Sequence, residues 1–328
     1  MFNPDFLVAS ADYAGVMDTV VIPALRDREK QTTLRAGDGT PLYCVSWSAD
    51  HPAGTVLVLH GFTENAYKYS ELVYSLLNSG FSVLAYDQRG HGRSGRAAGI
   101  PDPSVTHVES FQDYVSDLET VCDRLLAPMP EPHLIFAHSM GGAVAALFLE
   151  KHPDRFAAAS LCAPMIAPNT SGVPVFAAAA ICRLAGLLGR GRRHPFFMKP
   201  YSGPEDFSTS CATDSARFSW YDGVKAAREE FRNSVPTYRW TLESLGVTKR
   251  ILAPGEPEKI TCPVLLSSAE HDSSVMPEPQ KQFISRVPNG RRIFVSGARH
   301  EIFRSVNDVF FPWWHQVLDF LKTASGAC

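Results

Sequence analysis

The amino-acid sequence predicts an α/β protein with a mostly parallel central sheet, helices on both faces of the sheet and an inserted helical lid. From residue 55 onward, short apolar runs alternate with segments long enough to form helices, which is typical of parallel strands joined by crossover helices. Polar or glycine-containing turns follow several of these runs, at the end of such a sheet where ligands bind. The alternation is interrupted over 166–254 and then resumes, which indicates an insertion.

The elements follow in a definite order. Residues 31–36 and 42–47 flank Gly37-Asp38-Gly39-Thr40, a turn sequence typical of a β-hairpin. The later strands are expected at 55–59, 81–86, 133–137, 157–162, 263–269 and 291–296. The helices are expected at 66–79, 106–126, 140–151, 277–287 and 303–322. We therefore divide the chain into an N-terminal arm (1–30), a core (31–165 and 255–328) and a lid (166–254).

Ser139 lies in a turn between an expected strand and an expected helix. Small residues surround it in Ala137-His138-Ser139-Met140-Gly141-Gly142, where larger side chains would collide as strand and helix approach each other. A strand, such a turn and a helix form the nucleophile elbow of α/β-hydrolases, usually Gly-x-Ser-x-Gly. Here Ala137 takes the first glycine position. The turn is expected to lift the hydroxyl above the sheet, next to the positive end of the helix.

A serine hydroxyl needs a base that takes its proton, and in this fold the partners follow in the order Ser, Asp or Glu, His. Asp272 follows the strand at 263–269, and we prefer it to Glu270 because it lies in the loop beyond the strand. His300 follows the last expected strand. A solvated loop histidine is the alternative interpretation of His300. The order and placement predict a triad of Ser139, Asp272 and His300.

The predicted oxyanion hole joins two backbone N–H groups. The strand at 55–59 runs into His60-Gly61-Phe62, and a His-Gly turn after an early strand supplies one donor while the residue after the nucleophile supplies the other. These donors are the N–H groups of Phe62 and Met140. We expect His60 itself to brace the loop.

Several longer stretches carry a resemblance to a known family. They are 64–72, 86–96, 107–118, 137–153 and 235–240. On these stretches the chain resembles the bacterial lysophospholipase and monoacylglycerol lipase group of α/β-hydrolases, especially the inner-membrane-associated lysophospholipases. The resemblance implies a serine hydrolase that cleaves the acyl ester of lysophospholipids through an acyl-enzyme, with no cofactor. A monoacylglycerol lipase or a general carboxylesterase would use the same triad. A non-catalytic ligand receptor on this scaffold is the remote alternative.

Composition excludes several other classes of function. The formal net charge of −3 over 328 residues gives no basic field for nucleic acid. The seven cysteines include no Cys-x-x-Cys pair, which suits a reducing compartment. No cluster has metal-ligand spacing, and no apolar stretch reaches the roughly 20 residues of a spanning helix. The N-terminus has no secretory pattern. We expect a cytoplasmic enzyme without a metal ion.

The lid has two possible roles. Residues 173–188 are strongly apolar, and Arg190, Arg192 and Arg193 follow at once. The segment could be a buried lid helix with a solvated basic turn. Alternatively, its apolar face enters lipid while the arginines meet anionic head groups, which would hold the enzyme on the inner face of the cytoplasmic membrane.

The glycine-rich loop after the strand at 81–86 carries Asp87, Arg89, His91 and Arg93. We expect these side chains mainly to shape the rim of the active site through salt bridges and hydrogen bonds. Head-group contact is the alternative.

Overall fold

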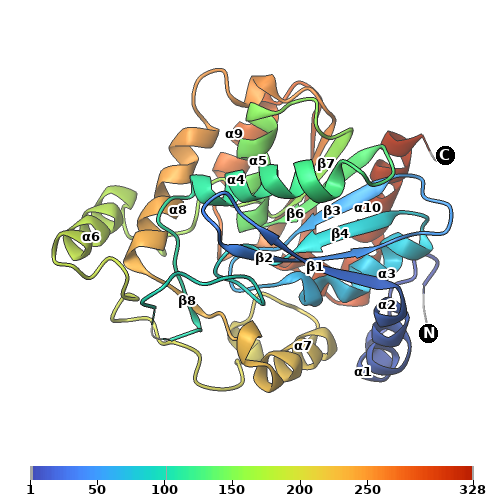
Figure 1. The fold of residues 1–328 in the computed structure, drawn as a ribbon, viewed down its shortest axis with the longest axis horizontal. Coiled ribbons are helices and arrows are strands. Elements are labelled where there is room, and N and C mark those ends of the chain that lie inside the picture. Colours follow the sequence, from blue (N-terminus) through green and yellow to red (C-terminus); the bar gives the residue numbers. More distant parts are fainter. Residues whose placement is uncertain (1–2, 101, 327–328) are drawn as a thin grey trace.

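An eight-stranded sheet forms the centre of the molecule (Figure 1). The computed structural model describes residues 3–100 and 102–326. In the strand order β1-β2-β4-β3-β6-β7-β9-β10, β2 is antiparallel to both neighbours and every later pair is parallel. The mostly parallel sheet predicted from the sequence is confirmed. The strands are β1 (Glu29–Arg35), β2 (Pro41–Trp47), β3 (Thr55–Leu59), β4 (Ser82–Tyr86), β6 (His133–His138), β7 (Ala158–Cys162), β9 (Val264–His271) and β10 (Gly290–Arg299).

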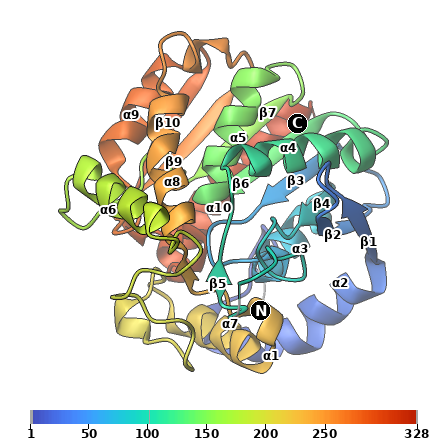
Figure 2. The ribbon, with the colours of Figure 1, turned by 60° about the vertical axis from the view of Figure 1, so that its left-hand side comes forward.

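Helices cover both faces of this sheet (Figures 1 and 2). One face packs against α4 (Gln112–Val121), α5 (Met140–Lys151) and α9 (Pro277–Arg286). The other packs against α3 (Ser70–Asn78) and α10 (Asn307–Ser325). Strands β3, β4 and β7 are buried along their whole length, as a sheet covered on both sides requires.

The N-terminal arm is helical and belongs to the packed fold. It consists of η1 (Ser10–Asp12), α1 (Tyr13–Val16), a π-helical turn η2 (Met17–Val21) and α2 (Ile22–Arg28). Its apolar residues enter the same core as α3 and α10. The Val8 N–H and the Tyr13 hydroxyl both donate to Glu71 of α3, at 2.9 and 3.0 Å. These bonds hold the start of the arm against α3, and Nε1 of Trp47 in β2 donates to the Leu25 carbonyl oxygen of α2 at 3.1 Å.

The helix expected over 106–126 begins later than predicted, at Gln112, and ends in a π-helical turn, η4 (Cys122–Leu126). The preceding residues instead form β5 (Val105–Thr106), which pairs in parallel with β8 (Val235–Pro236). This pairing uses a partner 130 residues away in the chain, so local helix propensity could not reveal it.

Residues 166–254, the expected lid, contain three helices, α6 (Val175–Leu187), α7 (Ser215–Ala227) and α8 (Tyr238–Ile251), with the turns η5 (Phe207–Thr209) and η6 (Glu229–Phe231). Helix α8 places Trp240, Val247 and Ile251 in the core. Helix α6 lies on the outer side of α8 (Figure 2). The turns η7 (Pro257–Lys259), η3 (Ala66–Tyr69) and η8 (Ile302–Arg304) complete the helical elements. Over the described ranges, no helix is long and apolar enough to cross a membrane.

Candidate active site

Ser139 lies at the junction of β6 and α5, in a backbone conformation with φ +51° and ψ −116°. Such a positive φ is strained for a residue with a side chain, and it persists because the surrounding packing enforces it. A Cβ on Gly141 would lie 2.6 Å from the carbonyl oxygen of His60, and one on Gly142 would lie 2.6 Å from Cβ of Pro164. The small residues of the predicted elbow are therefore a packing requirement.

The structure brings the three predicted triad residues together. Nε2 of His300 lies 2.8 Å from Oγ of Ser139, and Nδ1 of His300 lies 2.8 Å from Oδ2 of Asp272. The other Asp272 oxygen accepts the N–H groups of Ser274 and Val275 at 2.8 and 3.0 Å. Ser139 is 7% exposed and His300 is 5% exposed. The chain through His300 is the geometry that lets an imidazole take a serine proton.

The alternative acid, Glu270, points elsewhere. Its carboxylate accepts the Ser296 hydroxyl at 2.6 Å and the Gly297 N–H at 2.7 Å, on the exposed side of β9 and β10. The sequence-based preference for Asp272 over Glu270 therefore agrees with where the two carboxylates lie.

Burial and charge act in opposite directions on the His300–Asp272 pair. Burial disfavours the imidazolium, but the Asp272 carboxylate outweighs it and raises the pKa of His300 above its ordinary value. Burial likewise disfavours the Asp272 carboxylate, but His300 and the two backbone N–H groups lower the pKa of Asp272. Asp272 therefore stabilises the protonated form of His300. A general base needs this stabilisation, because it must hold the proton that it takes from the serine.

The loop with the first predicted oxyanion donor lies against the nucleophile. A Cβ on Gly61 would lie 3.0 Å from Cβ of Ser139, which places the Phe62 end of the loop beside the serine. The Met140 N–H belongs to the first turn of α5, where N–H groups lack an intrahelical acceptor. His60 is buried beneath the loop; its Nε2 accepts the Gln88 N–H at 2.8 Å, so Nδ1 carries the proton toward the Gly61 carbonyl.

A buried carboxylate that the sequence analysis did not single out orders this loop. Glu64 accepts the Gly61 N–H at 2.6 Å and lies 3.0 Å from Nδ1 of His138 and 2.8 Å from Nζ of Lys68. Burial would raise the pKa of Glu64, but Lys68 and His138 hold it well below the usual range. The signal was an acidic residue three positions after Gly61 of the His-Gly turn and four positions before Lys68.

The triad opens into a cavity of about 560 Å³ beneath the lid. Ser139 and His300 lie at its polar end, near Phe62 and Glu64. Most of the remaining wall is apolar, with contributions from Met165, Val173, Ile181, Phe197, Trp240 and Leu245. A long hydrocarbon chain fits such a wall, and an ester group fits the polar end.

The three lid arginines do not line this cavity. Arg192 forms an ion pair with Glu109 and donates from Nη1 to the carbonyl oxygen of Ala98 at 2.8 Å. Arg190 and Arg193 are exposed. Helix α6 is not the buried helix of the first interpretation, because most of its large apolar side chains face solvent: Val175, Phe176, Ile181, Leu184 and Leu187.

The glycine-rich loop has the structural contacts expected from the sequence. Asp87 accepts the N–H groups of Ala66 and Arg93 at 2.7 and 2.8 Å. Arg89 forms two hydrogen bonds of 2.6 Å with Asp117. Among the described residues, no group of three His, Cys, Asp or Glu side chains is placed to hold a metal ion.

Comparison with known proteins places these features in context. A family model described as Hydrolase_4, serine aminopeptidase, S33, matches residues 50–307. Lysophospholipase L2 of Escherichia coli (strain K12) is 33% identical over 300 residues, covering 87% of this chain and 85% of that protein.

Two solved structures share the fold. A monoacylglycerol lipase from Paleococcus ferrophilus superposes with a TM-score of 0.66 and 21% identity, over 86% of this chain and 99% of that one. A soluble variant of monoglyceride lipase from Saccharomyces cerevisiae, in complex with a substrate analog, has a TM-score of 0.69 and 19% identity, over 90% and 96% of the two chains. The α/β-hydrolase fold is therefore established for this chain.

Proposed function

We propose that this chain, which belongs to the serine aminopeptidase S33 (Hydrolase_4) family of α/β-hydrolases, hydrolyses the acyl ester of lysophospholipids. The observation that carries the proposal is a hydrogen-bonded Ser139–His300–Asp272 chain at the polar end of a large, mostly apolar cavity. The similarity to a lysophospholipase over 87% of the chain supports the same substrate class.

The proposed reaction proceeds through an acyl-enzyme. His300 takes the Ser139 proton as Oγ attacks the ester carbonyl, while Asp272 orients the imidazole and stabilises its positive charge. The N–H groups of Phe62 and Met140 hold the oxyanion. His300 then gives its proton to the leaving glycerol oxygen, the glycerophosphodiester departs, and water attacks the acyl-enzyme with His300 again as base.

The charges around the site favour an ester substrate over a peptide with a free amino terminus. The acidic residues that line the cavity are Glu64 and Glu301. Both form ion pairs with the buried Lys68, at 2.8 and 2.6 Å. A substrate ammonium group would find these carboxylates already compensated, whereas an acyl chain and a neutral ester carbonyl need no such partner.

The exposed apolar surface of the lid supports peripheral contact with a membrane. Leu187 is 86% exposed and Phe196 is 87% exposed; Leu187 lies three residues before Arg190 in the chain, and Phe196 lies three residues after Arg193. We propose that these apolar side chains enter the lipid surface while the two arginines meet anionic head groups on the cytoplasmic side. Arg192, the third arginine, instead fastens the lid to Glu109.

The decisive experiment compares kcat/KM of the purified protein for lysophosphatidylethanolamine, lysophosphatidylglycerol, monoacylglycerol and p-nitrophenyl esters of graded length. We expect lysophospholipids to be the best substrates and the Ser139→Ala variant to lose activity by about 10⁴-fold or more. A preference for monoacylglycerol would reassign the enzyme to the lipases. Near-normal hydrolysis by Ser139→Ala would refute the triad.

A fluorophosphonate probe separates an enzyme from a non-catalytic receptor. Only an activated serine reacts readily with such a probe. We expect covalent labelling of the natural protein and none of the Ser139→Ala variant.

A further inference from the structure

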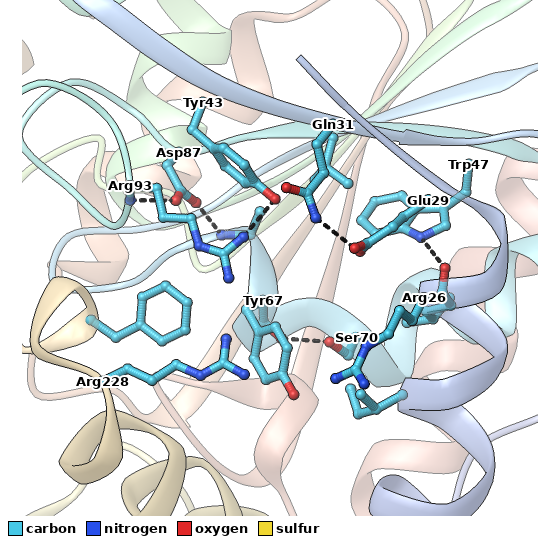
Figure 3. Close-up of a pocket in the computed structure, with 15 residues that line it drawn as sticks. Arg26, Glu29, Gln31, Tyr43, Trp47, Tyr67, Ser70, Asp87, Arg93 and Arg228 are labelled. Atoms are coloured by element: carbon cyan, nitrogen blue, oxygen red, sulfur yellow. Dashed lines mark hydrogen bonds between the residues drawn. The ribbon is translucent and has the colours of Figure 1, made fainter. Parts of the chain in front are cut away.

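A second cavity, of about 210 Å³, shares no lining residue with the catalytic cavity. Four parts of the chain meet around it: the N-terminal arm with the β1–β2 hairpin, η3 with the start of α3, the glycine-rich loop after β4, and the segment from the end of α7 through η6 (Figure 3). We propose that this cavity binds a small phosphate ester that carries hydroxyl groups, such as a polyol phosphate.

Three guanidinium groups converge on the cavity. Arg26 comes from the last turn of α2, Arg93 from the glycine-rich loop, and Arg228 from the end of α7 (Figure 3). All three guanidinium charges also act on the nearby Tyr67 hydroxyl. Burial raises the pKa of Tyr67 overall, and each of the three charges lowers it in part. Guanidinium groups bind phosphate through paired N–H donors, so three of them around one space form a strong oxyanion site.

These guanidinium groups form few ion pairs with carboxylates of the protein. Within the described ranges, neither Arg26 nor Arg228 has a carboxylate within 4 Å, and Arg93 has only Glu230, at 3.9 Å. Asp87 also lines the cavity, but both of its oxygens already accept backbone N–H groups. A bound anion could therefore pair directly with Arg26 and Arg228.

Aromatic rings hold two of the guanidinium groups in place. Arg93 Cζ lies 4.8 Å from the ring centre of Tyr43, and its Nη1 donates to the Tyr43 hydroxyl at 2.7 Å. Arg228 Cζ lies 4.8 Å from the ring centre of Tyr67. The ring of Phe231 lies within 5.7 Å of both arginines. Such stacking fixes the donors before a ligand arrives, which reduces the entropy lost on binding.

A carboxylate in the same wall favours a ligand with hydroxyl groups. Glu29 lines the cavity and accepts a hydrogen bond of 2.6 Å from Nε2 of Gln31, a neutral donor. A carboxylate has room for further donors, and ligand hydroxyls can supply them. The site therefore combines an oxyanion pole at the arginines with a hydroxyl-accepting pole at Glu29.

The test is a calorimetric titration of the protein in phosphate-free buffer with sn-glycerol 3-phosphate, inorganic phosphate and glycerol. We expect saturable binding of sn-glycerol 3-phosphate, weaker binding of inorganic phosphate and none of glycerol. Arg26→Gln and Arg228→Gln should each weaken sn-glycerol 3-phosphate binding by about tenfold or more. Glu29→Gln should remove the advantage of sn-glycerol 3-phosphate over inorganic phosphate.

Arg28→Gln is the matched control, because Arg28 lies in the same turn of α2 but pairs with Asp50 at 3.5 Å and does not line the cavity. It should bind both phosphates as the natural protein does. Thermal unfolding should show that all variants are folded, and ester hydrolysis by Arg228→Gln should be unchanged, which separates this site from the catalytic one. The absence of saturable binding, or binding that survives in the Arg26→Gln/Arg228→Gln double variant, would overturn the anion site. Equal affinity for the two phosphates would overturn the hydroxyl-accepting pole.

Discussion

The carboxylate of Glu64 accepts a hydrogen bond from the amide N–H of Gly61, with 2.6 Å between oxygen and nitrogen. The same oxygen lies 3.0 Å from Nδ1 of His138, the residue that precedes Ser139. Glu64 thus joins the loop that carries one proposed oxyanion donor to the turn that carries the proposed nucleophile. The relative position of the two depends on this one buried group.

Glu64→Gln should therefore lower kcat by roughly 10- to 100-fold with little change in KM, since a small displacement of the oxyanion loop affects the transition state more than substrate binding. Steady-state kinetics on a soluble p-nitrophenyl ester measure this. Glu119→Gln, which removes a surface ion pair with Lys151, is the control and should behave as the natural protein does. A rise in KM at constant kcat would assign Glu64 to substrate binding instead.

Gly61→Ala should reduce kcat by about 100-fold. The added Cβ would lie 2.8 Å from the Glu64 carboxylate, 2.9 Å from Nδ1 of His138 and 3.0 Å from Cβ of Ser139, so the loop must move away from the nucleophile. Gly37→Ala is the matched control, because a Cβ there meets no atom within 4 Å. Full activity of Gly61→Ala would show that the loop does not supply an oxyanion donor.

The acidic limb of the pH profile should report the ionisation of His300. The imidazole must be neutral to take the serine proton, so kcat/KM should fall as pH drops through a His300 pKa that Asp272 raises above 6.5 despite burial. Asp272→Asn removes the carboxylate, which should move this limb to lower pH and decrease kcat by about 10⁴-fold.

Glu270→Gln serves as the control for that variant, because Glu270 is the other acidic residue near the end of β9 and its contacts are with Ser296 and Gly297. It should retain both the rate and the pH profile. If Glu270→Gln were the impaired variant, the assignment of the orienting acid would be wrong.

The lid surface makes a prediction about membranes. Leu187→Ser/Phe196→Ser should weaken binding to anionic vesicles by at least about tenfold, because two apolar side chains would no longer leave water. Hydrolysis of a soluble short-chain ester should not change. Phe294→Ser is the control: Phe294 is 55% exposed but belongs to β10, outside the lid. Equal weakening by Phe294→Ser would indicate non-specific adsorption.

Arg190→Ser/Arg193→Ser should weaken binding to anionic vesicles but not to zwitterionic ones, since the arginines act through head-group charge. Co-sedimentation with vesicles of the two compositions measures the difference. Unchanged binding to both would refute the interfacial role of these arginines.

Glu150→Gln should stabilise the protein in alkaline solution. Burial on α5 raises the pKa of Glu150 to about 9, and within the described structure its Oε1 has no hydrogen-bond partner. Above pH 4.5, the ordinary pKa of a glutamate, the Glu150 carboxyl is ionised in the unfolded state but still protonated in the folded state. Between these values the free energy of unfolding should fall by up to about 1.4 kcal/mol per pH unit.

The variant lacks this group, so its unfolding free energy should decline less steeply with pH. Denaturant titrations at pH 5 and pH 8 measure the two slopes. Parallel slopes for the variant and the natural protein would show that Glu150 ionises normally in the fold.

The core strands were predictable because burial on both faces forces nearly continuous apolar runs, and β3 was predicted with its observed bounds. The spacing around Ser139 likewise reflects steric limits that act within a few residues. The start of α4 was not predictable, because β5 forms only through its pairing with the distant β8.

Contacts between distant residues explain the rest of what the sequence did not reveal. Glu64 acquires its role only when Lys68 and His138 surround it in the folded state. Arg26, Arg93 and Arg228 are spread over about two thirds of the chain and meet only at one cavity. The exposure of Leu187 depends on α6 lying outside α8 rather than against the sheet, and hydrophobicity alone predicts the opposite.

The pairing of β5 with β8 fastens the later part of the lid to the core, and the ion pair of Arg192 with Glu109 fastens the earlier part. In the later part, Asn233 also donates to Gly90 and Thr106, both at 2.8 Å, so the return of the chain to the core is held by several bonds. The earlier part, 171–200, contributes walls of the catalytic cavity but no residue of the hydrolytic machinery. Replacing that stretch as a unit would therefore change the preference for the acyl chain and leave the catalytic residues unchanged.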